Sequence, residues 1–174
     1  YIEGIMTNDD ASTTTPSNDR DRPVLQVIVG STRPGRIGRS FAEWIERIAT
    51  DHGDFTVEMV DLADVALPFL DEPNHPRLAQ YTHQHTRDWS ATISRADAFI
   101  LVTPEYNGFP TPLVINAFDW LSRLGAGDGL PTGLATTANK PVGLLSASPG
   151  ALGGLRSMNY LRQYFQMNFQ MVVQ

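Results

Sequence analysis

Short apolar blocks alternate with longer amphipathic stretches along most of the chain. Several blocks are rich in β-branched residues and have the length of strands that are buried in a sheet. Strands are therefore predicted at residues 24–29, 55–60, 98–102, 141–145 and 171–173. Strands that alternate with helices in this way predict a single α/β domain with a parallel sheet.

The stretches between these blocks carry apolar residues at helical spacing. Residues 37–48 place apolar side chains on one face, so this helix should pack on the strand before it. Trp89, Ile93 and Ala96 have the spacing of a buried helix face, and residues 155–165 repeat the pattern. A predicted helix therefore follows each of the first four strands.

The helix predicted over residues 112–124 is apolar over an unusually broad arc. The helix of a monomeric domain normally buries an arc of about 100°. Trp120 and Leu124 would then remain partly exposed. We therefore expect part of this helix to form a subunit interface.

The first strand ends in the loop GSTRPGRIG at residues 30–38, immediately before a helix. A helix N-terminus offers unpaired N–H donors and a partial positive charge. Ser31, Arg33 and Arg36 add a hydroxyl and two guanidinium groups, which form charge-assisted bonds with phosphate. The loop is predicted to bind an anion.

Two other phosphate-binding motifs do not fit this loop. Gly30, Gly35 and Gly38 lack the G-x-G-x-x-G spacing of a dinucleotide fold. Gly30 and Gly35 have Walker A spacing, but Arg36 and Ile37 replace the lysine and the magnesium-binding hydroxyl. A nucleoside triphosphatase is therefore excluded, whereas a plain glycine-rich turn stays open.

Two further loops follow predicted strands, at residues 103–116 and 146–154. Ligands of open α/β sheets bind at the carboxyl ends of the strands. Backbone N–H groups of Tyr106, Asn107 and Gly108 could bond the edge of a flat heterocycle, with the Tyr106 ring against its face. The small residues of the third loop permit close approach of backbone to a ligand.

Composition narrows the function further. The net charge of −6 argues against nucleic acid or an anionic membrane surface as partner. The chain has no cysteine and no apolar run of membrane-spanning length, so we expect a cytoplasmic protein. Residues 1–22 are polar and lack apolar periodicity, which predicts a disordered arm before a domain at residues 23–174.

Three of the four histidines, His75, His83 and His85, fall close together. Imidazole is a common zinc ligand. However, His83 and His85 are two residues apart and so would not share a helix face, and no cysteine joins them. Solvated or interface histidines are expected here, and no metal site.

Together, the motifs resemble those of the NADPH-dependent FMN reductase family. They are GSTRPGRIG at Gly30–Gly38, TPEYNG at Thr103–Gly108, NAFDWL at Asn116–Leu121 and SASPGALGGLR at Ser146–Arg156. The resemblance implies a flavodoxin-like, doubly wound sheet of five parallel strands in the order 2-1-3-4-5. It also implies a homodimer or homotetramer.

In that family the first loop holds the FMN phosphate, the second lies along the flavin ring and the third closes around its edge. The resemblance implies that cofactor-binding residues come from all three loops. They are Ser31, Arg33, Arg36, Ile37, Gly38, Pro104, Glu105, Tyr106, Asn107, Gly108, Ser146, Ser148, Pro149 and Gly150. No catalytic side chain is assigned, because the cofactor carries the chemistry.

The chain departs from the family at three places. Many relatives have serine or threonine where Arg36 stands, so Arg36 could instead point outward or serve the NADPH phosphate. Ile115 replaces a lysine, which removes a possible ion pair at the subunit contact. No residues remain for the helix that normally follows the fifth strand, so we expect either a truncated chain or a covering layer that comes from elsewhere.

The implied function is an FMN-dependent oxidoreductase that takes hydride from NADPH or NADH. The acceptor would be a small molecule such as a flavin, a quinone, an azo compound or a metal oxyanion. One alternative is a flavodoxin-type electron carrier without its own NADPH site, but Arg33 and Arg36 favour the reductase. Another is a flavin-free regulatory domain, which flavin colour in the purified protein would exclude.

Overall fold

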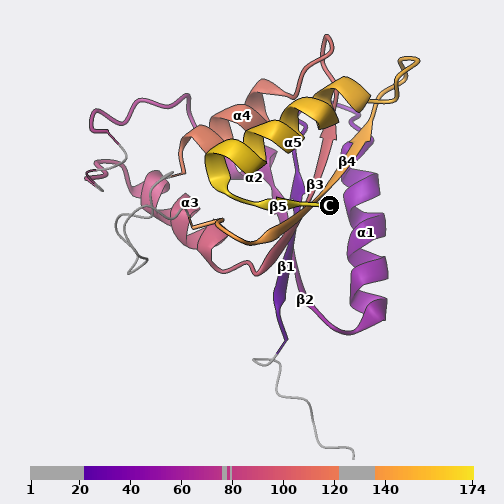
Figure 1. The fold of residues 1–174 in the computed structure, drawn as a ribbon, viewed down its shortest axis with the longest axis horizontal. Helices are drawn as coiled ribbons and strands as arrows, with labels where there is room; N and C mark the ends of the chain where they lie inside the picture. Colours follow the sequence, from indigo (N-terminus) through magenta and orange to yellow (C-terminus); the bar gives the residue numbers. More distant parts are fainter. Residues whose placement is uncertain (1–21, 76–77, 79, 122–135) are drawn as a thin grey trace, which may run out of the picture.

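Five parallel strands form one sheet in the order β2-β1-β3-β4-β5 (Figure 1). The structure is a computed structural model, and it describes residues 22–75, 78, 80–121 and 136–174. The strands are β1 (Val24–Val29), β2 (Thr56–Asp61), β3 (Ala98–Pro104), β4 (Pro141–Ala147) and β5 (Val172–Val173). This order confirms the predicted flavodoxin-like, doubly wound sheet.

The helices cover the two faces of the sheet unequally. Their bounds are α1 (Gly38–His52), α2 (Leu62–Val65), α3 (Gln84–Ser94), α4 (Pro112–Asp119) and α5 (Leu155–Phe169). In Figure 1, α1 lies alone on one side of the sheet, whereas α3, α4 and α5 lie on the other. Right-handed crossovers produce this arrangement. The β1-to-β2 connection runs toward one edge of the sheet, whereas the connections to β3, β4 and β5 run toward the other edge, so their helices lie on the opposite face from α1.

Two apolar cores follow from this layering. Alternate residues of β1 point to opposite faces, so Ile28 joins the core under α3, α4 and α5, while Val27 and Val29 face α1. The first core is large and aromatic, and the second contains little more than Ala42 and Val102 besides the two valines. Most of the buried apolar surface therefore lies on the three-helix side.

The apolar face predicted for α1 packs only in part. The fully covered residues of α1 are Ala42 and Ala49, whereas Phe41, Trp44 and Ile48 are 37%, 49% and 50% exposed. The helix approaches the sheet through small side chains, and its larger ones lie beside the contact. An apolar groove of about 390 Å³ remains between α1 and the sheet, lined by Leu25, Trp44, Ile45, Ile48, Ala49, His52, Phe55, Ala98 and Ile100.

The helix α4 is buried within the chain itself, so the expectation of an exposed Trp120 was wrong. Trp120 is only 2% exposed. The Trp89 indole N–H donates to the Ala117 carbonyl at 2.6 Å, and the Phe118 ring lies 4.6 Å from that of Phe165 on α5. The sheet, α3 and α5 thus fill the broad apolar arc.

Some expectations fall outside the described residues. Leu124 and nearly all of the predicted N-terminal arm belong to this group. In the part of the chain that the structure describes, no helix combines the length and the apolar character needed to cross a membrane.

Candidate active site

A cleft of about 360 Å³ opens at the carboxyl ends of β1, β3 and β4. All three loops singled out in the sequence contribute to it. Its lining comprises Ser31, Arg33, Pro34, Gly35, Arg36, Ile37, Gly38, Phe41, Val102, Thr103, Pro104, Glu105, Tyr106, Ala147, Ser148 and Pro149. The predicted residues Asn107, Gly108, Ser146 and Gly150 are not among the lining residues.

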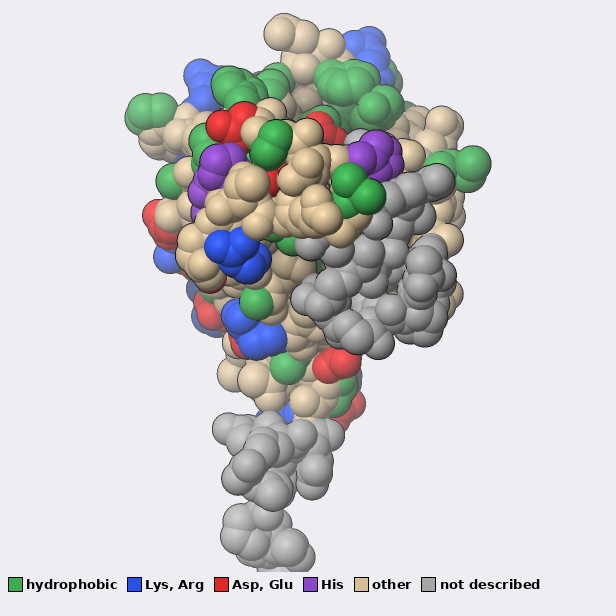
Figure 2. Space-filling model, turned by 90° about the vertical axis from the view of Figure 1, so that its left-hand side faces the viewer, with side chains coloured by type: hydrophobic (Ala, Val, Ile, Leu, Met, Phe, Trp, Pro, Cys, Tyr) green, Lys and Arg blue, Asp and Glu red, His purple; other side chains and the backbone are tan. Residues whose placement is uncertain are grey.

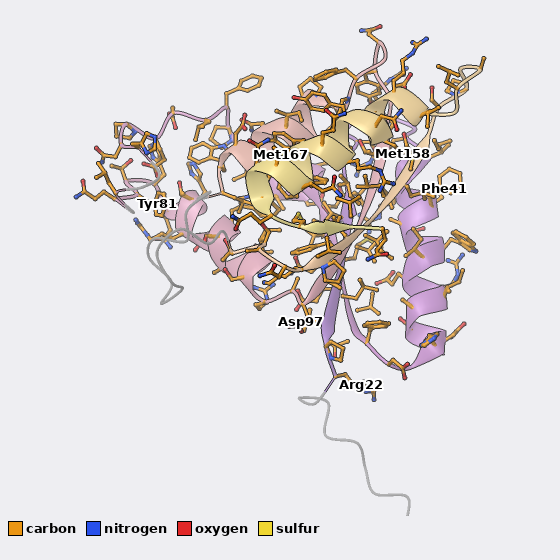
Figure 3. The ribbon with its side chains drawn as sticks, viewed as in Figure 1. Arg22, Phe41, Tyr81, Asp97, Met158 and Met167 are labelled. Atoms are coloured by element: carbon orange, nitrogen blue, oxygen red, sulfur yellow. The ribbon has the colours of Figure 1, made fainter. Side chains whose placement is uncertain are left out.

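Sequence reasoning missed Phe41, which lines the cleft from the first turn of α1 (Figure 3). Its helical spacing placed it in the core, although it is 37% exposed. Its position four residues after Ile37, in the turn that follows the glycine-rich loop, was the available signal.

The first loop presents unused donors to the cleft. Ser31 is 2% exposed, and its Oγ is buried with no hydrogen-bond partner among the described residues. No side chain caps the N-terminus of α1 at Ile37, so N–H groups of its first turn have no cap. A Cβ on Gly38 would lie 2.8 Å from Ser31 Oγ, so glycine is what leaves this hydroxyl its space.

The two arginines of this loop differ. Arg36 forms a bidentate pair with Asp61, at 3.0 and 2.6 Å, and also donates to the Ser31 carbonyl. Arg39 donates to the same Asp61 carboxylate at 2.9 Å. Arg33 is exposed and lines the cleft, and it has no ion-pair partner within the described ranges. Arg33 therefore presents a free charge, and Arg36 ties the loop to the end of β2.

The Asp61 carboxylate joins the first loop, α1 and α2. Its side chain is 2% exposed, and it also accepts the Ala63 N–H at 3.0 Å, which caps α2. Hydrogen bonds to Asp61 and then to Glu43 raise the pKa of Arg39. A buried carboxylate needs such partners, because an unpaired one is strongly destabilising.

The second loop ends in a tight turn. The N–H and C=O groups of Tyr106 and Phe109 bond each other at 2.9 and 3.0 Å, and Asn107 and Gly108 both have positive φ, of 53° and 81°. Two positive φ angles are typical of a type I′ turn, for which Asn-Gly is the preferred pair. The Tyr106 N–H is thus already bonded, so the expectation that it binds a heterocycle edge was wrong.

Glu105 connects the second loop to the third. Its carboxylate accepts the N–H groups of Arg156 and Ser157 at 3.1 and 3.2 Å, in the first turn of α5. The N-cap of α5 is Gly154, which has no side chain to do this. A carboxylate at a helix N-terminus is stabilised by the helix dipole. Glu105 therefore holds the second loop against the start of α5, which follows the third loop.

Comparison with known proteins identifies the family. The sequence profile described as NADPH-dependent FMN reductase matches residues 24–174. The chain is 30% identical to an NAD(P)H-dependent FMN reductase of Nectria sp over 155 residues, 86% of this chain and 70% of that protein. It is 32% identical to a quinone reductase of Pseudomonas putida, over 80% of this chain and 67% of that protein.

An NAD(P)H-dependent FMN reductase of Schizosaccharomyces pombe is 39% identical over 101 residues, which are 57% of this chain but only half of that protein. The fold also matches solved structures. The FerB flavoenzyme NAD(P)H:(acceptor) oxidoreductase of Paracoccus denitrificans superposes with a TM-score of 0.67 at 22% identity, covering 87% of this chain and 75% of that one. The profile, which spans all of the sheet, and the Nectria and Pseudomonas relatives agree. The chain therefore belongs to the NADPH-dependent FMN reductase family, whose members are FMN-dependent oxidoreductases driven by NAD(P)H.

Proposed function

We propose that the cleft holds FMN with its phosphate at the first loop, and that the electron acceptor is a quinone. The observation that carries this proposal is the free guanidinium of Arg33 beside the unpartnered Ser31 hydroxyl. Both lie next to the uncapped N-terminus of α1. A phosphate dianion would satisfy all three donors at once, which an uncharged ligand would not.

The walls of the cleft suit a flat ring. Pro104, Tyr106 and Pro149 line it from the second and third loops, and Phe41 lines it from α1. Apolar and aromatic side chains of this kind cover ring faces and exclude water. Glu105 keeps the second and third loops at a fixed separation through its bonds to α5.

Bound FMN supplies the redox chemistry, since the flavin ring takes a hydride from NAD(P)H and passes electrons to an acceptor. The protein residues bind and orient the ring. The chemistry needs little acid–base catalysis from their side chains, because solvent can supply the proton that a quinone takes up together with the hydride. The Pseudomonas relatives and a Burkholderia relative are named for quinones, the latter as a 2-hydroxy-1,4-benzoquinone reductase. A quinone is a flat ring that fits the same walls.

Anaerobic mixing of the FMN-loaded protein with NADPH, and separately with NADH, tests the function. Flavin absorbance should bleach quickly with at least one of them and return on addition of 1,4-benzoquinone. Slow bleaching by both nucleotides would instead favour an electron carrier. Fast bleaching without recovery on quinone would leave the reductase but exclude this acceptor.

We also propose that the protein is a homodimer that uses the outer side of α5. Tyr160 and Met167 are seven residues apart in that helix, which places them on one side, and they are 38% and 81% exposed. Figure 3 shows Met167 on α5. The ring of Phe109, which is 46% exposed, lies against that of Tyr160, with the ring centroids 4.3 Å apart and the rings tilted by 47°. Contiguous exposed apolar groups favour association. Light scattering should show a dimer that Met167→Lys disrupts and the control Ile48→Lys on α1 does not.

A further inference from the structure

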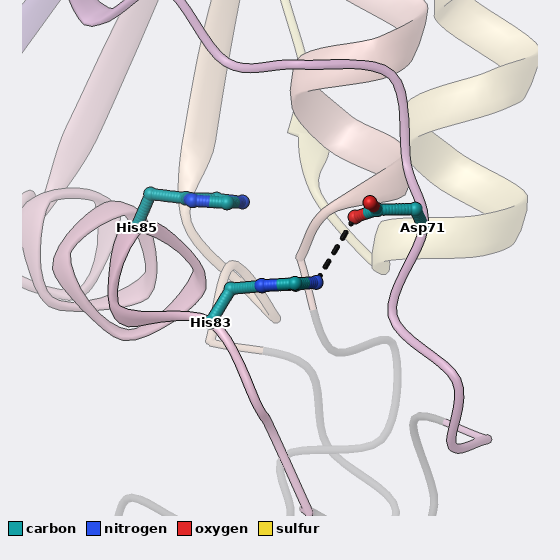
Figure 4. Close-up of side chains that lie close together, drawn as sticks. All are labelled: Asp71, His83 and His85. Carbon is teal, nitrogen blue, oxygen red and sulfur yellow. Dashed lines mark ion pairs between the residues drawn. The ribbon is translucent and has the colours of Figure 1, made fainter.

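Asp71, His83 and His85 converge (Figure 4), and none of the three lines the cleft. One ligand atom from each lies within 4.8 Å of the other two. His83 Nε2 is 3.1 Å from an Asp71 carboxylate oxygen. In Figure 4 both imidazoles point the same way, toward the carboxylate.

The two histidines meet because His83 is not part of the helix. It is the N-cap residue of α3, with an extended backbone, while His85 lies in the first turn. The two rings therefore stack at 5.0 Å with an angle of 8° between them. The reasoning from helix faces, which separated them on the basis of sequence, was wrong because it assumed helical geometry for both.

His85 provides an observation that points to a ligand. Its Nε2 is buried, and no described residue forms a hydrogen bond with it. The His85 ring stacks on that of His83 and makes a T-shaped contact with that of Trp120, with centroids 4.7 Å apart and an angle of 82° between the rings. A buried polar nitrogen without a partner is costly, so a native protein normally provides one. The ion pair of Asp71 with His83 does not involve the His85 Nε2 atom, which still lacks a partner among the described residues.

The segment that carries Asp71 is fixed on both sides. The Leu70 N–H donates to the Asn116 side chain on α4 at 3.1 Å. The Glu72 carboxylate accepts the N–H groups of Thr82 and His83 and the hydroxyl of Thr86, at 2.7 to 3.1 Å. The carboxylate and the imidazoles are thus presented by two segments that are already locked together, which is what a preorganised site requires.

We propose that Asp71, His83 and His85 bind one zinc ion, with water as the fourth ligand. Two imidazoles and a carboxylate plus an open position form a typical tetrahedral zinc set. Ligand atoms about 2.0–2.1 Å from the metal lie roughly 3.3 Å apart, so the His85 ring must turn inward slightly. Rotation of an imidazole about its last torsion is soft.

The surroundings permit entry of the ion. The side chains of Asp71 and His83 are 65% and 36% exposed, which leaves the open position in contact with solvent. Figure 2 shows imidazole groups at the surface of the face that carries α3. A bound ion would link the loop before α3 to the start of that helix and fix the contact of both with Trp120 on the adjoining end of α4.

Calorimetric titration of the tag-free, FMN-loaded protein with zinc, after removal of metals by a chelator, tests the proposal. The expected stoichiometry is one ion per chain. Asp71→Asn and His85→Gln should each weaken zinc binding by more than about 100-fold, since loss of even an outer-shell partner lowers affinity 10- to 100-fold. Bound Co²⁺ should show the visible bands of a tetrahedral site, and these should disappear in both variants.

His52→Gln is the matched control, because His52 also pairs with a carboxylate, Asp54 at 3.3 Å, but has no second imidazole beside it. It should bind zinc as the wild type does. Asp71 is exposed, so Asp71→Asn should fold normally even if His85→Gln does not. If the wild type binds zinc no more tightly than Asp71→Asn, or if His52→Gln weakens binding equally, the proposed site is wrong.

Discussion

Arg33 and Arg36 have the same side chain, three residues apart, in different surroundings. Arg36 has both terminal nitrogens on the buried carboxylate of Asp61, whereas Arg33 is free within the described chain. An arginine with two good bonds holds structure in place, and a free one in a cleft is available to a ligand. Their substitutions should therefore have different consequences.

Arg33→Ala should weaken FMN binding roughly 10- to 150-fold, because one charge-assisted bond contributes on the order of 1.5–3 kcal/mol. Riboflavin has no phosphate, so its affinity should hardly change. Fluorescence titration with both ligands measures the difference. If the FMN affinity stayed intact while the KM for NADPH rose and that for NADH did not, Arg33 would instead bind the 2′-phosphate of the nucleotide.

Arg36→Ala is the contrasting variant. It leaves the Asp61 carboxylate, 2% exposed, with Arg39 as its remaining guanidinium partner, so it should lower the free energy of unfolding. The affinities for FMN and riboflavin should fall together, because the whole loop loosens. Selective loss of FMN affinity in this variant would show that Arg36 touches the phosphate after all.

Gly154 is needed for its conformation and also for its lack of a side chain. Its φ is 98°, and an added Cβ would meet Ser146 Oγ well inside van der Waals contact. Gly154→Ala should therefore destabilise the fold by about 2–4 kcal/mol. Gly53→Ala separates the two causes, since Gly53 has a φ of 85° but no neighbouring atom of the described residues lies within 4 Å of an added Cβ. Urea unfolding should show a loss for Gly53→Ala of only about 1 kcal/mol.

The first loop could be predicted from its residues, but the different roles of its two arginines could not. Glycines, a hydroxyl and arginines before a helix are local signals. The partner of the Arg36 guanidinium is Asp61, 25 residues away, which reaches the loop because β1 and β2 pair along their whole length. By contrast, the Asn-Gly pair is a turn signal in the sequence, so the hydrogen bond that the Tyr106 N–H donates could have been predicted.

At the scale of elements, two glutamates that are distant in sequence hold the starts of helices. Glu105 in the second loop accepts two N–H groups of the first turn of α5 and so caps that helix. Glu72 instead accepts the N–H groups of the two residues before α3 and the hydroxyl of Thr86 in its first turn. Sequence rules look for a cap next to the helix, so they find Thr111 before α4 and miss both glutamates. These distant contacts also position the second and third loops of the cleft and the histidine cluster.

Glu72 makes the stability of α3 dependent on pH. Burial by itself would raise the pKa of Glu72, but hydrogen bonds from Thr82, Thr86 and His83 outweigh it and lower the pKa to about 2. The ordinary value is 4.5, so the native state binds this proton less readily than the unfolded chain. The contribution is therefore complete above about pH 5 and is lost as the pH falls from 4.5 toward 2.

Glu72→Ala should lower the free energy of unfolding at pH 7 by about 1–2 kcal/mol, because it removes hydrogen bonds to a charged group that solvent partly screens. The difference from wild type should narrow as the pH falls from 5 to 2. Urea unfolding at a series of pH values measures it, with Glu46→Ala on α1 as control. A gap that stayed constant down to pH 2 would contradict the lowered pKa.

At the scale of the molecule, the alternation of strands and helices predicted a parallel sheet, and the resemblance to the reductase family predicted its strand order. The buried strands and the core positions Trp89, Ile93 and Ala96 were predictable from periodicity. The surroundings of α4 were not, because periodicity shows how wide an apolar arc is and does not show what covers it. Here α5 and the segment around Pro68, which accepts the Trp120 indole N–H at 2.8 Å, cover it.

The unequal cover of the sheet has a consequence for local unfolding. The contacts that hold α1 are few and involve small residues, whereas α4 and α5 interlock through Phe118, Phe165 and Phe169. Opening of α1 exposes less apolar surface than opening of α4, so it requires less free energy. In native-state hydrogen exchange, amides of α1 should exchange through a sub-global opening, whereas those of α4 should exchange only through complete unfolding. The first loop, joined to the first turn of α1, would then exchange with it, and FMN should slow the exchange of both together.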